Sequence, residues 1–438
     1  MNLHGDFDHS KVVIYLVGGF VRDHFMEVEP KDKDYVVVGS SPEEMLSLGF
    51  KQVGADFPVY LHPVSGDEYA LARTERKSGE GYQGFTCEWS GVTLEEDLSR
   101  RDLTINSIAW DCTRNLGKVH DPFGGIKDIK DKVLRHTSGA FVEDPLRVLR
   151  VARFMARFNK YYNGLGDSWK VAPETLKLLV SMELTNLTHE RVWLELEKAL
   201  GEYSPSVFFD ELSLWNTIFP EWQSLWDTPQ REDHHPEGNV GIHSGMVMDY
   251  LARNGGSEEE IFAALCHDFG KPICWDKYEN AHGHEKEGLS FINNFCDKWK
   301  VPNKYRKLAL ITCEYHTKVH GCLGRGTNKG MKPKSIMKLF EDTGALRDPV
   351  MFRKMLVVCE ADAKGRGSGQ EQIAEFESRP YPQRIYLEDC LSAVLHYSSK
   401  EVSRKLLSEG KSGIIIGQTI RQEKIKKIRE VVDAYKFV

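Results

Sequence analysis

Two aspartates spaced for one face of a strand are the first residues of this chain that suggest chemistry. Asp32 and Asp34 open an extended apolar stretch that ends at Gly39, and residues two apart in a strand point to the same side. Two carboxylates held side by side repel each other unless a cation lies between them. Mg²⁺ that bridges the phosphates of a substrate is the usual solution. The alternative, which a lone Asp-x-Asp would favour, is a solvated acidic edge.

The segment before these aspartates has the pattern of a phosphate-binding turn. Val12–Val17 is an apolar, β-branched run that predicts a buried strand, and Gly18 and Gly19 end it. Glycines let backbone N–H groups approach a phosphate, and the N-terminus of the short helix that follows, with Arg22, adds positive potential. A turn without a phosphate is the alternative for this segment alone. The order of strand, turn, helix and acidic strand instead favours nucleotidyl transfer.

A third carboxylate can join the same face. Val59–His62 and Glu68–Arg73 alternate in polarity on either side of a turn and predict a β-hairpin. Glu68 begins the second of these strands, so its side chain can point toward Asp32 and Asp34. Either Asp34 or Glu68 could then draw the proton from an attacking hydroxyl, and the sequence leaves both assignments open.

Two helices further along carry charged residues that could serve a site. Thr93-Leu94-Glu95-Glu96 is a capping box, and it predicts a helix that carries residues 100–109. Asp144-Pro145 predicts the start of another helix, on which arginines at spacings of three and four share one side. These arginines are Arg147, Arg150, Arg153 and Arg157. On spacing alone, a solvated amphipathic helix is the favoured interpretation of this arginine row.

Composition limits the class of protein. The chain has 438 residues, of which 41% are apolar and 28% charged, as is typical of a soluble protein with several domains. With a formal charge of −7, any nucleic-acid-binding surface must be local. No apolar run is long enough to span a membrane, and no signal-peptide pattern opens the chain. The nine cysteines form no Cys-x-x-Cys pair, so we expect reduced thiols in a cytoplasmic protein, without a disulfide framework or a zinc site.

Five motifs occur along the chain in order. They are Gly18-Gly19-Phe20-Val21-Arg22-Asp23, Asp32-Lys33-Asp34, Arg100-Arg101-Asp102-Leu103-Thr104-Ile105-Asn106, Asp121-Pro122 and Glu143-Asp144-Pro145-Leu146-Arg147. In this order they resemble the motifs of the class II tRNA nucleotidyltransferases, which are the CCA-adding enzymes, and in particular the bacterial multifunctional form that carries an HD domain. The resemblance is dense over residues 12–200, resumes over residues 241–271 and thins after residue 365.

The resemblance implies an α+β fold. An N-terminal nucleotidyltransferase head, made of a mixed β-sheet with helices, would be followed by an all-α neck, body, HD domain and tail. The implied boundaries are 1–140 for the catalytic head, 141–228 for the neck and body that bind the nucleotide base and tRNA, 229–365 for the HD phosphohydrolase domain, and 366–438 for the helical tail.

The resemblance also assigns roles at the transferase site. Asp32 and Asp34 would hold Mg²⁺, and Asp32, Asp34 and Glu68 would be the catalytic carboxylates. The nucleotide would be bound by Gly18, Gly19, Arg22, Arg101, Asn106, Asp144, Arg147, Arg150 and Arg153. Asp144 and Arg147 would select the base without a template, since cytosine and adenine both present an amine beside a ring-nitrogen acceptor. Uracil and guanine would leave Asp144 facing a carbonyl.

A second site is implied for the histidine-rich segment. Gly241-Ile242-His243, Leu265–Lys271 and Asp362 resemble the H…HD…D pattern of HD phosphohydrolases. The implied metal ligands are His243, His267, Asp268 and Asp362. Imidazole combined with carboxylate suits Ni²⁺ or another transition metal such as Mn²⁺ or Co²⁺, which would activate water. Further nitrogen donors for a substrate phosphate or a second metal are His282, His284, His316 and His320.

The last segment is helical and basic, with seven Lys or Arg against three Asp or Glu from Lys411 onward. A contact with the tRNA backbone is expected from Arg421, Lys424, Lys426, Lys427 and Arg429. The expected activity is addition of CCA to tRNA 3′ ends from CTP and ATP, with metal-dependent hydrolysis of 2′,3′-cyclic phosphates, 2′-nucleotides or phosphomonoesters. The enzyme would act as a monomer or homodimer without membrane contact.

Two alternatives remain open from the sequence. A bacterial poly(A) polymerase has a homologous head, although the HD pattern argues against this assignment. A catalytically inactive tRNA-binding protein is the other alternative, although Asp32, Asp34, Arg101, Asp144 and Arg147 are all in place. Incorporation of CTP would separate the main interpretation from both.

Overall fold

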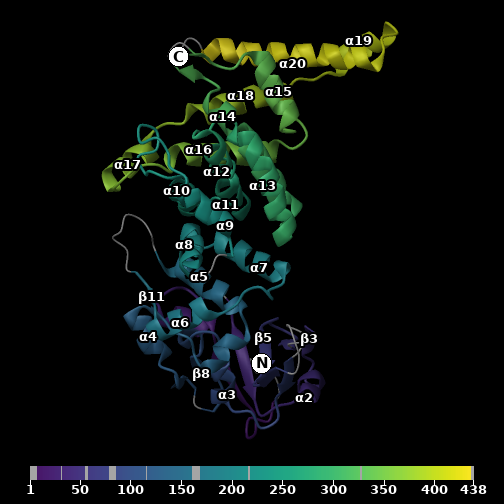
Figure 1. The fold of residues 1–438 in the computed structure, drawn as a ribbon. Coiled ribbons are helices and arrows are strands. Elements are labelled where there is room, and N and C mark those ends of the chain that lie inside the picture. The colour runs from purple at the N-terminus through teal and green to yellow at the C-terminus, as the bar shows by residue number, and fades with distance from the viewer. Residues whose placement is uncertain are drawn as a thin grey trace. The chain divides into compact units, whose positions relative to one another are not determined.

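Two compact units make up the chain in the computed structural model, which describes residues 7–30, 32–54, 58–77, 85–114, 116–159, 168–215, 218–325 and 328–435. The first unit is Met1–Phe158 with Asp167–Thr188, and the second is Asn159–Gly166 with His189–Val438. Figure 1 draws the first unit mostly in purple and blue and the second in teal to yellow. The boundary between the units falls within the expected neck and body, and the four-part division of the chain remains a prediction.

A seven-stranded sheet forms the centre of the first unit, in the order β3-β4-β5-β2-β1-β8-β9. Neighbouring strands are antiparallel except β2 and β5, which run parallel. The strands are β1 (Val13–Val17), β2 (Asp34–Val38), β3 (Lys51–Val53), β4 (Val59–Leu61), β5 (Glu68–Leu71), β8 (Ala109–Asp111) and β9 (Val119–His120). The strand predicted from the first apolar run is confirmed, and so is the hairpin, which β4 and β5 form.

Helices and short elements complete the first unit. The helices are α1 (Gly19–Phe25), α2 (Pro42–Ser47), α3 (Leu94–Ser99), α4 (Gly125–Asp131), α5 (Leu146–Phe158) and α6 (Pro173–Ser181). Two small sheets pair β6 (Thr74–Lys77) with β7 (Phe85–Glu88) and β10 (Val133–Leu134) with β11 (Lys170–Val171). Val17, Val36 and Ala109 of the central sheet share a buried core with Leu98 of α3. This core fixes α3, and the residues that follow it, against the sheet.

The prediction that a helix carries residues 100–109 is wrong. The capping box at Thr93 is confirmed, but α3 ends at Ser99. The chain then forms a short 3₁₀ turn and the strand β8, which pairs with β1. Pairing with β1 prevails over the local helical pattern because it leaves Ile108 and Ala109 fully buried, at 0% exposure.

In the part of the second unit that the structure describes, one small hairpin accompanies the helices. The predicted α+β class is confirmed, and the part expected to be all-α is largely helical. The hairpin pairs β12 (Gly324–Arg325) with β13 (Asn328–Lys329). The helices are α7 (His189–Leu200), α8 (Pro205–Trp215), α9 (Pro220–Trp226), α10 (Val240–Arg253), α11 (Glu258–Cys266), α12 (Lys271–Tyr278), α13 (His284–Trp299), α14 (Asn303–His320), α15 (Pro333–Asp342), α16 (Pro349–Lys364), α17 (Gln370–Ser378), α18 (Pro382–Leu395), α19 (Lys400–Ser408) and α20 (Gly413–Tyr435). Within the described ranges, no helix combines the length and apolar character needed to cross a bilayer.

Helix α11 lies among several other helices of the second unit. It packs against α10, α14 and α16, and its last turns from Ile261 to Cys266 are buried. The segment after α11 passes close to α13 at Gly270, where a Cβ atom would lie 2.0 Å from the carbonyl oxygen of His284. Only glycine allows this approach. The two residues that directly follow α11 are therefore held deep inside the unit.

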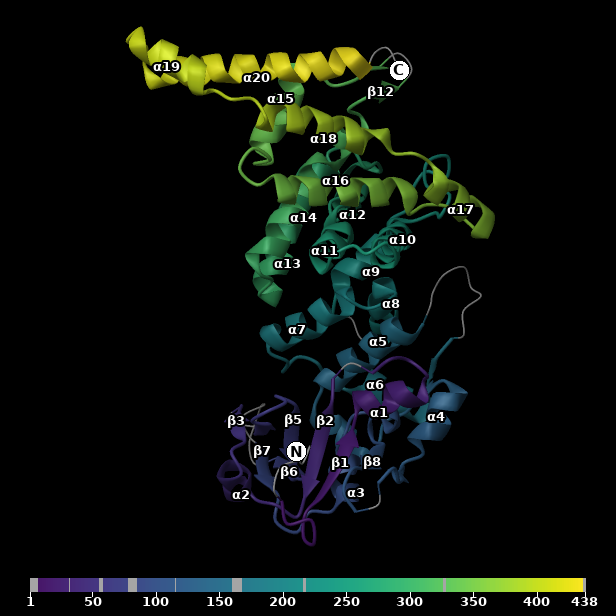
Figure 2. The same ribbon diagram turned by 180° about the vertical axis from the view of Figure 1, so that it is seen from behind.

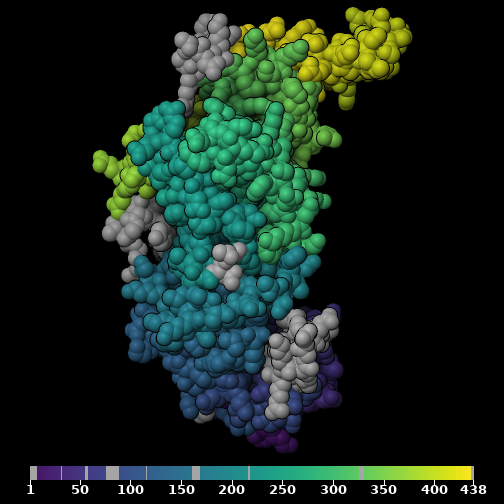
Figure 3. Space-filling model, viewed as in Figure 1, coloured from purple at the N-terminus to yellow at the C-terminus, as the bar shows by residue number. Residues whose placement is uncertain are grey.

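Helices α19 and α20 form the last part of the second unit. Helix α20 packs against α15 and α18, as Figure 2 shows, and it buries Ile425 and Ile428. Helix α19 buries none of its residues, and in Figure 3 the yellow end of this pair projects beyond the green part of the unit. The apolar contacts of α20 thus anchor the tail and leave most of its polar surface in solvent.

Candidate functional sites

Three carboxylates meet where β2 and β5 begin. The parallel register places Asp34 directly beside Glu68. Asp32 precedes β2, since the strand begins at Asp34, so it lies outside the strand that was expected to carry it. Desolvation raises the pKa of Asp34; the Arg101 guanidinium opposes this shift, and the charges of Glu68 and Asp32 add to it. The arrangement concentrates negative charge that a divalent cation would neutralise.

Gly18, Arg101 and Asp34 lie next to one another. Gly18 has a φ of 69°, and a Cβ atom there would lie 3.4 Å from Arg101 Nη1 and 3.6 Å from Asp34 Oδ2. The Asp97 carboxylate, whose side chain is fully buried, forms ion pairs with Arg101 at 3.3 Å and with Arg100 at 2.8 Å. Although burial opposes ionisation, these two guanidiniums hold the pKa of Asp97 below its ordinary value. The sequence analysis missed Asp97, which positions Arg101 beside the glycine turn.

A buried network joins predicted nucleotide-binding residues to one another. Arg22 donates from Nη1 to Asn106 Oδ1 at 2.7 Å, and Asn106 Nδ2 donates to Asp102 Oδ1 at 2.9 Å. Arg150 donates from Nε to Asp102 Oδ2 at 2.8 Å. Arg22 and Asn106 are only 4% and 7% exposed. These predicted residues thus meet through Asp102, a carboxylate to which the sequence analysis gave no role.

The N-terminal end of α5 holds the predicted base-selecting pair. Asp144 Oδ1 accepts a hydrogen bond from the Leu146 N–H at 3.1 Å, so this aspartate starts the helix as predicted. Arg147 donates from Nη1 to the carbonyl of Ala140 at 2.8 Å and from Nη2 to the carbonyl of Arg100 at 2.5 Å. The second bond brings Arg147 to the backbone of the residue just before Arg101.

The arginine row of α5 is not a solvated face. Arg153 is 8% exposed, and Arg147, Arg150 and Arg157 are half-buried. Arg157 Nη2 lies 3.1 Å from Asp23 Oδ2, and Arg150 takes part in the network described above. Burying a guanidinium costs desolvation energy, which its acidic partners offset. The solvated-helix interpretation of this row is therefore wrong.

The basic residues of α20 are partly neutralised by neighbouring acids. Three of the residues predicted to bind RNA form ion pairs: Arg421 with Glu341 at 2.7 Å, Lys426 with Glu423 at 2.5 Å, and Lys427 with Glu430 at 2.8 Å. Among the residues that the structure describes, Lys424 and Arg429 form no ion pair. The contact with tRNA remains a prediction, and these two cations are the ones most available for it.

The second unit brings the residues of the HD pattern into one buried cluster. His243 lies in α10, His267 and Asp268 follow α11, and Asp362 lies in α16. Their exposed fractions run from 0% to 3%. His243 Nε2 lies 3.1 Å from Asp362 Oδ1, and His267 Nε2 lies 3.1 Å from Asp268 Oδ2. Ligand atoms of His243, His267 and Asp268 lie within 4.8 Å of one another, a spacing that suits a metal ion.

The donor atoms of this cluster fit a metal ion. Within the described residues, His267 Nε2 and both carboxylate oxygens of Asp268 are buried and make no aligned hydrogen bond. The Lys271 ammonium, 2.7 Å from Asp268 Oδ2, offsets part of the cost of burying that oxygen, and coordination to a metal would satisfy the atoms that remain. Although burial opposes ionisation, His267 and Lys271 hold the pKa of Asp268 well below its usual range. Asp268 is therefore an anionic ligand of the kind that transition metals bind together with imidazole.

A second group of ligands shares Asp268. His284 Nε2 and His316 Nε2 lie 3.3 Å and 3.8 Å from Asp268 Oδ1, and 3.2 Å from each other. Burial lowers the pKa of His316 to about 3, so its ring is neutral and has a lone pair to donate. His320 also reaches the cluster, where its Nε2 lies 2.6 Å from the carboxylate of Asp362 in α16. His282 is exposed and lies outside these groups.

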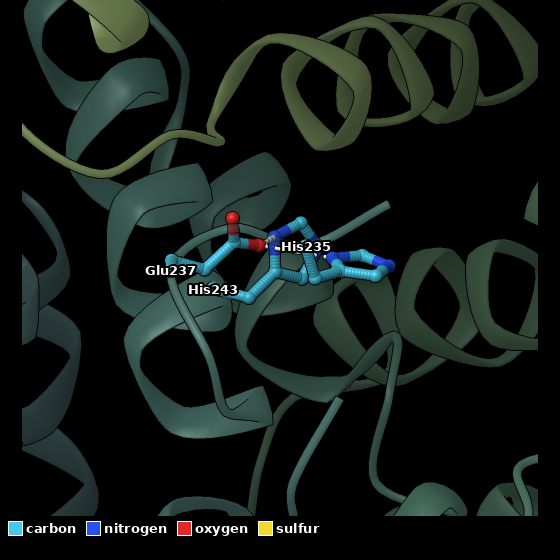
Figure 4. A group of neighbouring side chains, drawn as sticks. All are labelled: His235, Glu237 and His243. Carbon is cyan, nitrogen blue, oxygen red and sulfur yellow. Dashed lines mark hydrogen bonds and ion pairs between the residues drawn. The ribbon is translucent and has the colours of Figure 1, made fainter. Parts of the chain in front are cut away.

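The sequence analysis missed two residues of the cluster, His235 and Glu237. Both lie in the loop between α9 and α10, where only a domain boundary was expected. Glu237 Oε1 lies 2.9 Å from His235 Nδ1 and 3.0 Å from His243 Nδ1 (Figure 4). The three residues form a further group with metal-ligand spacing. Their only signal in the sequence is the run His234-His235-Pro236-Glu237 shortly before His243, which matches no motif.

Comparisons with known proteins cover nearly the whole chain. Residues 14–135 match the family model described as Poly A polymerase head domain. The chain is 44% identical over 427 residues to the Multifunctional CCA protein of Hahella chejuensis, which covers 95% of this chain and 94% of that protein. It is also 44% identical over 402 residues to the Multifunctional CCA protein of Mannheimia succiniciproducens, with 89% and 91% covered.

Solved structures share the fold. The chain is similar to the Bacillus stearothermophilus CCA-adding enzyme in complex with CTP, with a TM-score of 0.61, 21% identity, and 97% and 90% of the two chains covered. It is also similar to the Thermotoga maritima CCA-adding enzyme complexed with tRNA, with a TM-score of 0.58, 20% identity, and 98% and 91% covered. At these identities the likeness concerns the fold alone.

Proposed function

The chain belongs to the family of multifunctional CCA proteins, and we propose that it adds C, C and A to the 3′ ends of tRNA from CTP and ATP. The observation that carries this proposal is the site where β2 and β5 begin, in which Asp34 pairs with Glu68 beside Arg101 and the Gly18 turn. Phosphoryl transfer depends mainly on positioning and on neutralising phosphate charge. Clustered carboxylates for a divalent metal, next to a cation for a triphosphate, suit that chemistry.

The site residues of the first unit have separate roles in the transfer. Asp32 and Asp34 would hold Mg²⁺, which would neutralise phosphate charge when bound. Arg101, positioned by Asp97, contacts the triphosphate at the glycine turn. The tRNA 3′-hydroxyl attacks the α-phosphorus in line, pyrophosphate leaves, and either Asp34 or Glu68 accepts the hydroxyl proton at a carboxylate oxygen. Arg22 and Asn106 hold the segment that contains Arg101 through Asp102, and Arg22 also lies beside the glycine turn, where a Cβ atom on Gly19 would be 3.5 Å from Arg22 Nη2.

Asp144 and Arg147 select the incoming base in this proposal. A carboxylate accepts from the exocyclic amine of cytosine or adenine, while a guanidinium donates to the adjacent ring nitrogen. A carbonyl in place of the amine leaves a buried mismatch that costs about 1–3 kcal/mol. The bonds that Arg147 makes to the carbonyls of Ala140 and Arg100 keep its guanidinium at the start of α5. Specificity then resides in protein side chains and needs no template.

The test is incorporation of labelled nucleotides. The protein is incubated with Mg²⁺, a tRNA that lacks CCA, and each labelled nucleoside triphosphate in turn. We expect CTP to be added to the bare end, ATP to be added once after two C residues, and UTP and GTP to be rejected. Long A tracts without CTP use would identify a poly(A) polymerase, and no incorporation with intact tRNA binding would identify an inactive binding protein.

The cluster of the second unit supports a second activity, metal-dependent phosphohydrolysis. We assign His243, His267, Asp268 and Asp362 as ligands of Ni²⁺ or another transition metal, which supplies Lewis-acid activation of a hydrolytic water when bound. Lys271 keeps Asp268 ionised through its ion pair with that carboxylate at 2.7 Å. Suitable substrates are 2′,3′-cyclic phosphates, 2′-nucleotides and phosphomonoesters. Hydrolysis of damaged tRNA ends would restore the free hydroxyl that nucleotide addition requires.

The remaining assignments rest on the family and on the side chains in place. We propose a catalytic head over 1–140, a neck and body over 141–228, an HD domain over 229–365 and a tail over 366–438. A cytoplasmic location fits the cysteines that the structure describes, all of which are free thiols. Light scattering coupled to gel filtration would distinguish a monomer from a homodimer.

A further inference from the structure

Glu237 is a fully buried carboxylate in a loop that is held in one conformation. The loop joins α9 to α10, and its two ends pair through a bridge between Pro229 and Asn239. The Gln230 N–H donates to the Gly238 carbonyl at 2.8 Å, and Gly238 makes the turn with a φ of 98°. The side chain of Glu237 has 0% exposure. A carboxylate is costly to bury unless its oxygens are bound, so its partners indicate its purpose.

Both oxygens of Glu237 are bound to neighbouring segments. Oε1 is hydrogen-bonded to His235 Nδ1 at 2.9 Å and lies 3.0 Å from His243 Nδ1, which is close enough for an ion pair but is not aligned for a hydrogen bond. Figure 4 shows the three side chains together. Oε2 accepts a hydrogen bond from the Gly367 N–H at 3.2 Å, just beyond the end of α16. One carboxylate therefore connects the loop, the first turn of α10 and the segment that follows Asp362.

The orientation of the His243 ring follows from these contacts. Its Nδ1 faces Glu237, and its Nε2 lies 3.1 Å from Asp362 Oδ1 on the opposite side, toward the metal cluster. A neutral imidazole has one N–H donor and one lone pair, and both nitrogens of His243 face a carboxylate. A metal bound by Nε2 would take the lone pair of that nitrogen, so the proton would lie on Nδ1, opposite Glu237. With the proton on Nδ1, the lone pair is on Nε2, where a metal ligand needs it.

We infer that Glu237 is a positioning residue for the metal centre of the second unit: it fixes the tautomer and orientation of His243. This inference rests on the phosphohydrolase proposed above. A direct ligand role for Glu237 is the alternative, because the group His235, Glu237 and His243 also has metal-ligand spacing. Positioning is favoured because Oε1 already binds His235 and Oε2 already binds Gly367. Partners of this kind behind a metal-bound histidine typically strengthen metal binding 10- to 100-fold.

The first test measures metal affinity. The full-length protein is stripped with EDTA and titrated with Ni²⁺ by calorimetry, as wild type, Glu237→Gln and Asp249→Asn. Asp249 is a matched control because its carboxylate is also buried but binds Ser206, outside the metal cluster. We expect about 10- to 100-fold weaker binding in Glu237→Gln and wild-type affinity in Asp249→Asn. In the cyclic phosphodiesterase assay at saturating Ni²⁺, kcat should fall in Glu237→Gln while KM for substrate stays unchanged.

The outcomes separate this inference from the proposed function. Equal Ni²⁺ affinity in wild type and Glu237→Gln overturns the inference alone. If Glu237→Gln loses Ni²⁺ binding as completely as His243→Ala does, Glu237 is a ligand, and the positioning role is also overturned. If the wild type binds no metal, the hydrolase assignment and the inference are both overturned.

A second test needs no change at Glu237 and so is independent of the variant's folding. The full chain is labelled with ¹⁵N-histidine and loaded with Zn²⁺, which is diamagnetic. The His243 signals are identified by their absence from a His243→Asn sample. We expect a protonated Nδ1 and a metal-bound Nε2. A metal-bound or unprotonated Nδ1 contradicts the inference.

Discussion

At the scale of single residues, burial separates the residues that can touch a substrate from those that position others. Asp34 and Glu68 are accessible at the strand ends, and Arg101 lies beside them. Arg22, in contrast, is 4% exposed, and its guanidinium binds Asp23 and Asn106. Asp23 and Asn106 use several of the donors of this buried arginine, so it helps to hold the segment that contains Arg101. We therefore expect substitutions of Arg22 to disturb mainly the position of the segment that contains Arg101.

The strongest prediction at this scale concerns Asp34. Asp34→Ala should reduce nucleotide addition in Mg²⁺ by at least about 100- to 1000-fold, because it removes charge that the transition state requires. Binding of tRNA should survive, since the carboxylate is assigned to the metal and not to RNA. Incorporation assays and filter binding on the same preparation test both parts. Asp67→Ala, next to Glu68 in the hairpin turn, is the control, and near-normal incorporation by Asp34→Ala would contradict the assignment.

A pH effect is predicted for Asp249. Burial raises the pKa of Asp249 from 3.8 to about 7, although two hydrogen bonds from Ser206 oppose this rise. Between these pH values the folded protein keeps a proton that the unfolded chain has lost, so the contribution of this group to stability falls as pH rises. We expect calorimetric melting temperatures of the wild type to decline from pH 5 to pH 8 more steeply than those of Asp249→Asn. Parallel profiles for the two proteins would refute this prediction.

At the scale of secondary-structure elements, the position of a helix decides what its charged residues can do. The end of α11 lies between α10, α14 and α16, so His267 and Asp268 are enclosed by other polar residues of the cluster. Helix α20 buries only Ile425 and Ile428, so its charges face solvent and neighbouring acids. Enclosure makes the first set suitable for a metal, and exposure makes the second set suitable for a large polyanion.

The prediction for α20 uses two pairs of lysine or arginine residues that differ in their partners. Replacing Lys424 and Arg429 with alanine should raise KM for tRNA several-fold and lower the salt dependence of binding by about 1–2 units of slope. KM for the nucleotides should not change. Replacing Lys426 and Lys427, which pair with Glu423 and Glu430, should have a smaller effect. An unchanged salt slope in the first variant would mean that α20 is a solvated helix without an RNA contact.

At the scale of the whole molecule, two compact units each offer a different set of candidate metal ligands. The first unit offers carboxylates alone, which suit Mg²⁺, and the second offers imidazole with carboxylate, which suits a transition metal. The residues of each cluster lie entirely within one unit. Each activity should therefore tolerate loss of the other.

This independence predicts the behaviour of reciprocal variants. His267→Ala and Asp268→Ala should lose Ni²⁺- or Co²⁺-dependent hydrolysis of 2′,3′-cyclic phosphate and keep CCA addition close to wild type. Asp34→Ala should do the reverse. Both assays are run on one preparation of each variant. Hydrolysis that persists in both HD-pattern variants, or that disappears in Asp34→Ala, would show that the hydrolytic site lies elsewhere.

The sequence by itself determined the features that depend on near neighbours or on ordered motifs. The glycine turn after β1, the capping box at Thr93, the hairpin of β4 and β5 and the helix start at Asp144 were all predicted, because caps and turns are set by a few adjacent residues. The order of the motifs identified the family. The residues His243, His267, Asp268 and Asp362 were also named from their pattern, although their separation in the chain gave no distances.

Only the tertiary structure decided which distant side chains meet and which are buried. Residues 100–109 form a turn and a strand because pairing with β1 outweighs local helical preference. Asp97 behind Arg101, and Glu237 behind His243, could not be inferred from sequence because a lone acidic residue has no periodic or motif signal. Their roles arise from partners that packing brings within about 3 Å, where a low-dielectric surrounding makes each charge contact strong.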